Sequence, residues 1–222
     1  MNEQGSQAWR DGRAGRITAS CFAEAIAMKE VVTQRENKKQ GLERKTKLVP
    51  TDTRNTYMRS LIAEILSGQP KPEVSSRSLE WGKEHEPLAR ELYELKSGNF
   101  VEQTGLVVHP DFDFIAASPD GLIDDDGGLE MKCPKDPQIH IKTWMEGMPD
   151  EHIAQIQGGM FVTGRKWWDF VSFDPRQTPE MRLFVQRISR NDQYIDGVLQ
   201  PGLLAFWRDV QSALDQLRRK VG

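Results

Sequence analysis

A chain of 222 residues, of which 37% are hydrophobic and 28% charged, has enough apolar mass for one compact domain and is short for two. The 30 basic residues against 33 acidic ones leave a net charge of −3, which excludes the global basic field that many nonspecific nucleic-acid binders carry. Cys21 and Cys133 lie outside any CxxC spacing, which argues against a disulfide framework, a zinc ribbon and an iron–sulfur cluster.

The first predicted elements are a short helix and a charged connection. Thr18–Met28 is predicted to be helical, with Thr18 as its cap, because Phe22 and Ala25 recur at helical spacing. The segment Lys29–Arg59 holds nine Lys or Arg and four Asp or Glu residues and few large apolar ones. We therefore expect a solvated, mobile connection there.

Two further helices follow, each ended by a serine–glycine pair. The first covers Asn55–Leu66 and stops at Ser67-Gly68, after which two prolines keep the chain extended. The second follows Trp81-Gly82 and ends at Ser97-Gly98. The apolar stripe of that helix consists of Leu88, Leu92 and Leu95.

The pattern then changes to the period of β-strands. Short apolar runs separated by turn residues predict strands at 105–109, 114–118, 129–133, 167–173 and 181–189. A helix is expected at Glu151–Val162, and a final helix has one apolar face made of Leu203, Trp207, Val210, Leu214 and Leu217. Helices flanking a mixed central sheet predict one α/β or α+β domain over residues 1–222.

The most informative stretch is Ser118–Pro134, with the sequence SPDGLIDDDGGLEMKCP. Extended back to Asp111, it contains seven carboxylates and no Lys or Arg before Lys132. Crowded carboxylates repel one another unless a cation neutralises them, and hard oxygen ligands suit Mg²⁺ or Mn²⁺. The stretch therefore predicts a divalent metal site.

A hairpin would bring two of these carboxylates together. If Asp124–Gly128 is a turn centred on Asp125, then Asp120 lies opposite Glu130 on the paired strand. Because side chains alternate along a strand, Glu130 and Lys132 share one face. The other face, which can be the core, carries Leu129, Met131 and Cys133.

Two carboxylates and a lysine in this arrangement suit metal-assisted phosphodiester hydrolysis, in which Lys132 would orient the attacking water or neutralise charge. The alternative is an acidic surface hairpin with an ordinary E-x-K pair. An EF-hand fits less well, because counting back from Gly127 puts Leu122 at the first ligand position, where aspartate is required.

The same stretch resembles the PD-(D/E)xK nuclease motif of the lambda-type phage recombination exonucleases, a YqaJ-like family. Three other segments match in the same order: AWRDGRAGRITAS, LEWGKEHEPLARELYELKSG and HIAQIQGGMFVTGRKWWDFVSFDPR. Together they span nearly the whole chain. The resemblance implies a restriction-endonuclease-like core, in which a mixed central sheet is flanked by helices.

The resemblance also implies roles for individual residues. Asp120, Glu130 and Lys132 match the catalytic core of the family. Glu86 matches a catalytic helix glutamate that supports a second metal ion, although a carboxylate complementing a helix dipole is the simpler alternative. The backbone carbonyl of Met131 would be a further metal ligand.

An outer acidic ligand and a DNA-binding set complete the comparison with the family. Of the two candidates for the outer metal ligand, Asp111 is preferred to Asp113. The positions matching a pocket for a terminal 5′-phosphate are Arg13, Ser20, Ser118 and Gln155, and Gln157 is grouped with them. Arg77 and Leu79 match a loop that contacts DNA and wedges the duplex end apart. The alternatives are a helix start for Ser20, a helix surface for the glutamines and plain core for Leu79.

The function implied by the resemblance is a metal-dependent 5′→3′ exonuclease that degrades one strand of double-stranded DNA from its end. It would use two Mg²⁺ ions per site, with Mn²⁺ possible, and release mononucleotides to leave a 3′ single strand for phage homologous recombination. It would assemble as a homotrimeric ring and would act with a single-strand annealing protein as its partner. No stretch resembles a membrane span or a secretory signal, so we expect a cytoplasmic protein. The resemblance implies a phage or prophage origin in a bacterial host.

Two alternative functions remain open at this point. One is a structure-specific or site-specific DNA endonuclease of the same superfamily, because the metal site hydrolyses phosphodiesters wherever the strand is presented. The other is a non-catalytic DNA-binding module that has kept the fold and lost turnover.

Overall fold

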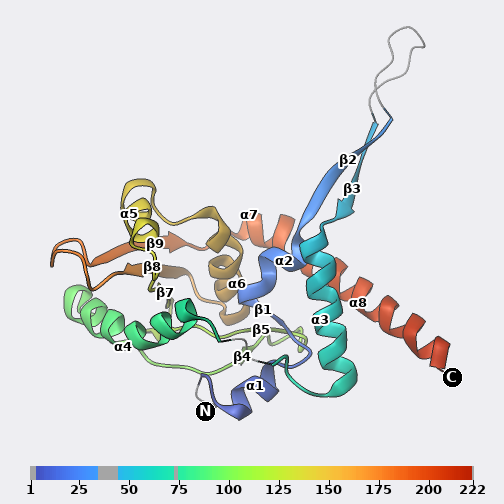
Figure 1. Ribbon diagram of the computed structural model, residues 1–222, viewed down its shortest axis with the longest axis horizontal. Helices are drawn as coiled ribbons and strands as arrows, with labels where there is room; N and C mark the ends of the chain where they lie inside the picture. Colours follow the sequence, from blue (N-terminus) through green and yellow to red (C-terminus); the bar gives the residue numbers. More distant parts are fainter. Residues whose placement is uncertain (1–3, 35–44, 73–74, 222) are drawn as a thin grey trace, which may run out of the picture.

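A computed structural model describes residues 4–34, 45–72 and 75–221 (Figure 1). The strands are β1 (Ile17–Thr18), β2 (Met28–Gln34), β3 (Lys45–Pro50), β4 (Val107–Val108), β5 (Ile115–Ala117), β6 (Gly121–Ile123), β7 (Gly127–Lys132), β8 (Trp167–Phe173) and β9 (Leu183–Ser189). The α-helices are α1 (Gln7–Arg13), α2 (Phe22–Ile26), α3 (Asp52–Ser67), α4 (Arg77–Ser97), α5 (Pro137–Glu146), α6 (Ile153–Thr163), α7 (Asp192–Tyr194) and α8 (Gln200–Val221). Shorter helical turns are η1 (Ala19–Cys21), η3 (Asp150–His152) and η4 (Ile195–Leu199).

A four-stranded mixed sheet carries the acidic motif. Its order is β6-β7-β8-β9, in which β7 and β8 are parallel and the outer pairs antiparallel. A parallel pair needs a crossover, and α5 and α6 lie in it. On one face, Tyr93 of α4 packs with Leu129 and Val171. On the other, Met160 of α6 packs with Trp168. The predicted mixed sheet flanked by helices is confirmed.

The strands β4 and β5 belong to a second sheet. Its order is β1-β5-β4, with β1 parallel and β4 antiparallel to β5. The single central sheet expected from the sequence is therefore divided in two. Between β5 and β6 the chain passes through Pro119, which has no N–H to continue a ladder. The largest buried cluster lies on this side of the molecule and includes Phe22, Ile115, Leu203 and Phe206.

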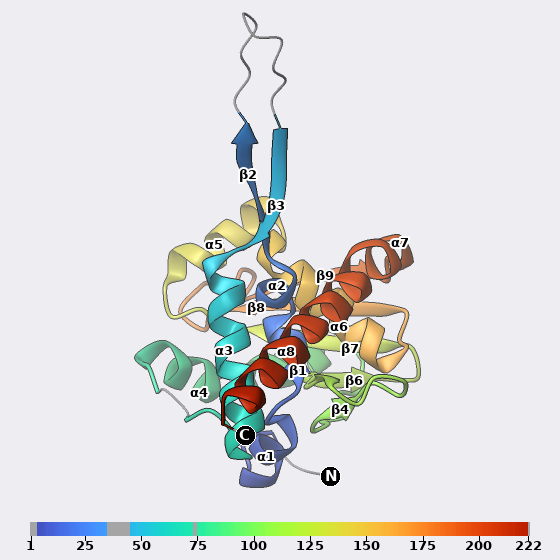
Figure 2. The same cartoon turned by 90° about the vertical axis from the view of Figure 1, so that its right-hand side faces the viewer.

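The expected solvated connection Lys29–Arg59 is largely a β-hairpin and a helix start. The strands β2 and β3 pair antiparallel, with Met28 opposite Pro50, and project from the body as an arm (Figures 1 and 2). Residues such as Val31 and Val32 favour extended backbone, while most side chains of this two-stranded ribbon stay exposed to water. Its solvation was thus predicted correctly and its lack of structure was not. The expectation for residues 35–44 lies outside the described part of the chain.

The first helices differ from the prediction at their boundaries. The predicted helix Thr18–Met28 is reduced to η1 and α2, because the backbone N–H of Ile17 donates to the carbonyl of Phe114 and holds β1 as a strand. The predicted second helix lies inside α3. The third, α4, begins before Trp81, at a cap formed by Ser76.

The glycines after α3 and α4 end both helices as the sequence predicts. Gly68 and Gly98 have φ values of 65° and 72°, a left-handed conformation that glycine adopts without strain. Three other helices, α1, α5 and the short α7, were not predicted. None of the residues of α1 is buried, so its sequence shows no apolar stripe.

The predicted final helix is confirmed as α8. Leu203, Val210 and Leu214 are buried, whereas Leu217, near the end that projects from the body in Figure 1, is 40% exposed. Within the described residues, no helix is both long and apolar enough to span a bilayer.

Candidate active site

The hairpin of β6 and β7 has the predicted register. Gly121 lies opposite Leu129 and Ile123 opposite Gly127, so Asp120, directly before β6, lies opposite Glu130. The backbone N–H of Asp120 donates to the carbonyl oxygen of Leu129 at 3.2 Å, which extends the ladder by one step. The two carboxylates that are ten residues apart in sequence are therefore brought together by the turn.

Side-chain alternation along β7 also follows the prediction. Leu129, Met131 and Cys133 are buried in the cluster shared with α4. Glu130, on the opposite face, is a buried carboxylate whose side chain is only 7% exposed. Lys132 Nζ lies 2.7 Å from Glu130 Oε1, close enough for a charge-assisted hydrogen bond.

A residue of α6 shares the Glu130 carboxylate. Gln155 Nε2 donates to Glu130 Oε1 at 2.6 Å, and Lys132 Nζ lies 3.4 Å from Gln155 Oε1. The amide therefore binds both members of the E-x-K pair. This connects the predicted catalytic strand to the helix that carries part of the predicted phosphate pocket.

Two carboxylates of the site, Asp120 and Glu86, have a raised pKa. Burial raises the pKa of Asp120 well above its usual range, and the Glu130 carboxylate adds to the shift. Burial, followed by Glu130, also raises the pKa of Glu86. Burial would lower the pKa of Lys132, but the Glu130 carboxylate reverses the effect and the net shift is upward. Three carboxylates face one ammonium group, so the site favours an added cation.

The chemistry of the donors fits a hard divalent cation. Glu86 reaches the site from α4, while Asp120 and Glu130 come from the hairpin, so the available ligands are carboxylate oxygens together with the Met131 carbonyl. Among the described residues, no three His, Cys, Asp or Glu side chains stand close enough together to make a ready-formed metal centre. Mg²⁺ retains several waters and takes only one or two protein carboxylates, so this donor set is sufficient for it.

The residues of the predicted phosphate pocket line one small cavity, which also includes Glu130. Arg13 connects two of the other residues. Its guanidinium donates to Ser118 Oγ at 3.2 Å and to Ser20 Oγ at 3.3 Å. Gln155 lines the same cavity from α6. Four polar side chains from separate parts of the sequence thus meet beside the predicted catalytic glutamate.

Two further residues position this cluster and were not singled out from the sequence. The Arg13 guanidinium lies over the ring of Trp9, 4.4 Å from its centre, and Trp9 Nε1 donates to Ser118 Oγ at 2.9 Å. Thr18 Oγ1 accepts from Arg13 Nη2 at 3.1 Å. Trp9 and Arg13 are four residues apart on α1, a spacing that would have identified the pair had this helix been predicted.

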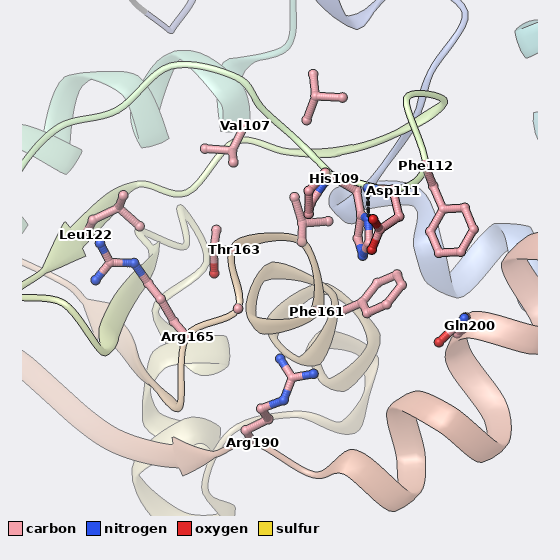
Figure 3. Close-up of a pocket in the computed structure, with 14 residues that line it drawn as sticks. Val107, His109, Asp111, Phe112, Leu122, Phe161, Thr163, Arg165, Arg190 and Gln200 are labelled. Atoms are coloured by element: carbon pink, nitrogen blue, oxygen red, sulfur yellow. Dashed lines mark hydrogen bonds between the residues drawn. The ribbon is translucent and has the colours of Figure 1, made fainter.

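The structure does not bring Asp111 to the site, contrary to its assignment as an outer metal ligand. Asp111 lines a different cavity, beside His109 and Phe112 (Figure 3), and its backbone N–H donates to His109 Nδ1 at 3.1 Å. The backbone carbonyl of Asp113 accepts from Arg16. Both acids precede β5 whereas Asp120 follows it, and three extended residues separate the two ends of that strand by about 10 Å.

Gln157 also lies away from the pocket, so its grouping with the DNA-binding residues is corrected. Its side chain is buried, its Nε2 donates to the carbonyl oxygen of Ser189 at 3.0 Å, and its Oε1 accepts from the backbone N–H of Asn191 at 2.8 Å. Two residues along a helix correspond to a rotation of about 200°. Gln155 and Gln157 therefore face opposite sides of α6.

The predicted DNA-contacting residues Arg77 and Leu79 lie at the start of α4. Ser76 caps this helix by accepting a hydrogen bond from the backbone N–H of Leu79 at 3.2 Å. The Leu79 side chain is 52% exposed, so the alternative of a core leucine does not hold. Their contact with DNA stays a prediction.

The site residues lie within a stretch that matches a known family. Residues 8–166, which include the hairpin and the cluster around Arg13, match the family described as the YqaJ-like viral recombinase domain. The chain belongs to this family.

Solved structures similar to this YqaJ-like chain cover nearly all of it. An alkaline exonuclease from Laribacter hongkongensis, LHK-Exo, is 33% identical over 97% of this chain and 98% of its own, with a TM-score of 0.81. The structure of LHK-Exo in complex with dAMP is 34% identical, again over 97% of this chain and 98% of its own, with a TM-score of 0.83. A phage-related exonuclease from Haemophilus somnus is 18% identical over 93% of this chain and 96% of its own, with a TM-score of 0.61. The shared fold is the restriction-endonuclease-like fold.

One curated relative of the YqaJ-like chain also matches. It is the uncharacterised protein R354 of Acanthamoeba polyphaga mimivirus, which is 28% identical over an alignment of 117 residues that covers 47% of this chain. The chain spans about a fifth of the length of that relative, since the match covers 21% of it.

Proposed function

We propose that this protein is a metal-dependent 5′→3′ exonuclease that degrades one strand of double-stranded DNA from its end. It releases mononucleotides and leaves a 3′ single strand for phage-type homologous recombination. Membership of the YqaJ-like recombinase family and similarity to LHK-Exo, an alkaline exonuclease, support a role as a DNA exonuclease in recombination.

The observation that carries the proposal is that Glu130 and Arg13 line the same cavity. An arginine with two serine hydroxyls and a glutamine can bind a terminal phosphate through charge-assisted hydrogen bonds. A 5′-phosphate held there would keep the neighbouring phosphodiester beside Glu130. Cleavage would then proceed from the 5′ end and remove one nucleotide at a time.

Mg²⁺, with Mn²⁺ as a substitute and two ions per site, is the proposed cofactor. Asp120, Glu130, the Met131 carbonyl and Glu86 would hold the ions. Bound divalent ions lower the pKa of a water ligand and stabilise the charge that develops on the phosphate. Lys132, hydrogen-bonded to Glu130, would orient the attacking water or neutralise charge beside it. Gln155 would keep the Glu130 carboxylate in place.

The proposed assembly is a homotrimeric ring around DNA, acting with a single-strand annealing protein in the cytoplasm of a bacterial host. A net charge of −3 is compatible with such a ring, because a basic inner channel can coexist with an acidic exterior. The proposal for partners and location follows from family membership and from a structure resembling phage-type exonucleases over almost the full chain.

Digestion of linear duplex DNA with one end labelled at a time tests the proposal. We expect early release of the 5′ label as a mononucleotide, dependence on Mg²⁺, and no cleavage of a covalently closed circle. Cleavage of the circle would favour the structure-specific or site-specific endonuclease. DNA binding without cleavage under any metal condition would favour the non-catalytic module.

A further inference from the structure

A second, larger cavity adjoins the predicted phosphate pocket. It has a volume of about 720 Å³ and lies between α1, the segment of β1 and α2, and α3. We call it the rear cavity. Among the described residues, Arg13 is the one that lines both cavities. Arg13 therefore lies between Glu130 and the rear cavity.

The lining of the rear cavity suits a nucleoside. Aromatic rings are present in Trp9 and Tyr57, and hydroxyl groups in Thr53, Thr56 and Ser60. Three acidic side chains (Glu24, Asp52 and Glu64) offset most of the charge of the four basic ones (Arg10, Arg13, Arg16 and Lys71), so the cavity does not favour a polyanion. Flat surfaces combined with donors and acceptors are what bases and sugars bind.

The size of the rear cavity is a second observation. A cavity of this volume also has ample room for one nucleoside.

We propose that the rear cavity receives the first nucleoside of a DNA strand that ends in a 5′-hydroxyl group. This proposal rests on the proposed exonuclease function. On a 5′-phosphorylated end, the terminal phosphate fills the site at Arg13 and the strand stops there. A 5′-hydroxyl end has no such group, so the first internal phosphodiester binds Arg13 instead. The terminal nucleoside then passes Arg13 into the rear cavity.

This register changes the first product. Water attacks the phosphorus between the second and third nucleosides, the bond from that phosphorus to the 3′ oxygen of the second nucleoside breaks, and this oxygen takes up a proton. The product is a dinucleoside monophosphate with two hydroxyl ends. The remaining strand begins with a 5′-phosphate and is digested to mononucleotides. Without the rear cavity, cleavage at the first phosphodiester would release a free nucleoside.

The test uses DNA hairpins with a single duplex end that differ only in carrying a 5′-hydroxyl or a 5′-phosphate group. Early products of the full-length protein with Mg²⁺ are identified by chromatography and mass spectrometry. We expect one dinucleoside monophosphate per 5′-hydroxyl strand and mononucleotides alone from the phosphorylated one. A free nucleoside as first product, or no digestion of the 5′-hydroxyl hairpin, overturns the inference. Failure to digest the phosphorylated hairpin would instead contradict the exonuclease function.

A cavity-filling variant provides the second arm. Thr56 is exposed on α3 and lines the rear cavity, so Thr56→Trp should fill it without disturbing the core. The initial-rate ratio of 5′-hydroxyl to 5′-phosphate substrate should fall at least about tenfold. Leu66→Trp adds the same ring at an exposed position of α3 outside the cavity and should leave the ratio unchanged. An unchanged ratio and unchanged products in Thr56→Trp would overturn the inference.

Discussion

The backbone N–H of Met131 donates a hydrogen bond of 2.7 Å to Oδ2 of Asp120. The strand that follows the hairpin turn thus fixes the carboxylate that precedes it. Because the donor is a main-chain group of β7, the position of this carboxylate is set by the register of the hairpin. An asparagine in its place has an oxygen that could accept the same bond.

This relationship predicts that Asp120→Asn abolishes cleavage and stabilises the metal-free protein. Burial and Glu130 raise the pKa of Asp120 in the folded state, so ionisation of this group opposes folding. The resulting loss of folding stability is complete above the raised pKa. It is absent below the ordinary pKa of about 3.9, where the group is protonated in both the folded and the unfolded state. Each unit by which the pKa is raised corresponds to about 1.4 kcal/mol.

Thermal unfolding in the presence of a chelator between pH 4 and 8 checks this prediction. The variant should melt several degrees above the wild type at neutral pH, since 1 kcal/mol shifts Tm by roughly 2–4 °C at this chain length. The difference should shrink as the pH falls towards 4. A variant less stable than the wild type at pH 7 would contradict the electrostatic account.

Lys132→Ala should abolish cleavage and leave folding and DNA binding largely intact. The lysine contacts Glu130 and Gln155 on the site face of β7, away from the apolar cluster. Circular dichroism, a DNA gel shift and a nuclease assay compare the variant with wild type. Lys166→Ala, which removes an exposed lysine near the same hairpin, is the matched control and should keep its activity. Cleavage by Lys132→Ala at near wild-type rate would remove this residue from the mechanism.

Arg13→Ala should slow digestion of 5′-phosphorylated duplex more than digestion of 5′-hydroxyl duplex, because a terminal phosphate carries nearly two negative charges and an internal phosphodiester only one. Charge-assisted hydrogen bonds to a terminal phosphate contribute roughly 1.5–3 kcal/mol, or about one to two decades in rate or affinity. The ratio of initial rates on the two substrates is measured at fixed salt, because backbone contacts depend on salt. Arg59→Ala, which removes an exposed arginine of α3, is the control. An unchanged ratio in Arg13→Ala would assign this residue to folding or general DNA binding.

Mg²⁺ should raise the melting temperature of the wild type and should do so much less for Glu130→Gln. The ion would relieve repulsion among Asp120, Glu130 and Glu86, and a ligand that binds only the folded state stabilises it in proportion to the logarithm of its concentration. A chelator should reverse the shift and stop digestion. Equal shifts in both proteins would locate the ion elsewhere.

The protein should be a trimer in solution. Sedimentation equilibrium should give close to three times the chain mass of 25.3 kDa. Family membership over most of the chain motivates this expectation. A monomer that persists at micromolar concentration would leave threading of DNA through a ring without a structural basis.

The sequence by itself determined the local geometry of the candidate site. The spacing of Asp120 and Glu130 around a turn fixed which residues lie opposite each other, because hairpin pairing is symmetric about its turn. Alternation along β7 likewise placed Glu130 and Lys132 on the face opposite Met131. These relationships depend only on the period of one strand and the length of one loop, both of which can be read from a short window.

Relationships between distant segments were decided by the tertiary structure. Trp9 meets Ser118 because α1 packs beside the end of β5, and nothing in either local sequence encodes that contact. Asp111 was misassigned because its distance from Asp120 depends on the strand between them. Helix periodicity alone places Gln155 and Gln157 on opposite sides of α6, but the groups that bind each side chain decided which of them faces the site. Periodicity orients side chains about one element, whereas packing between elements determines which of them meet.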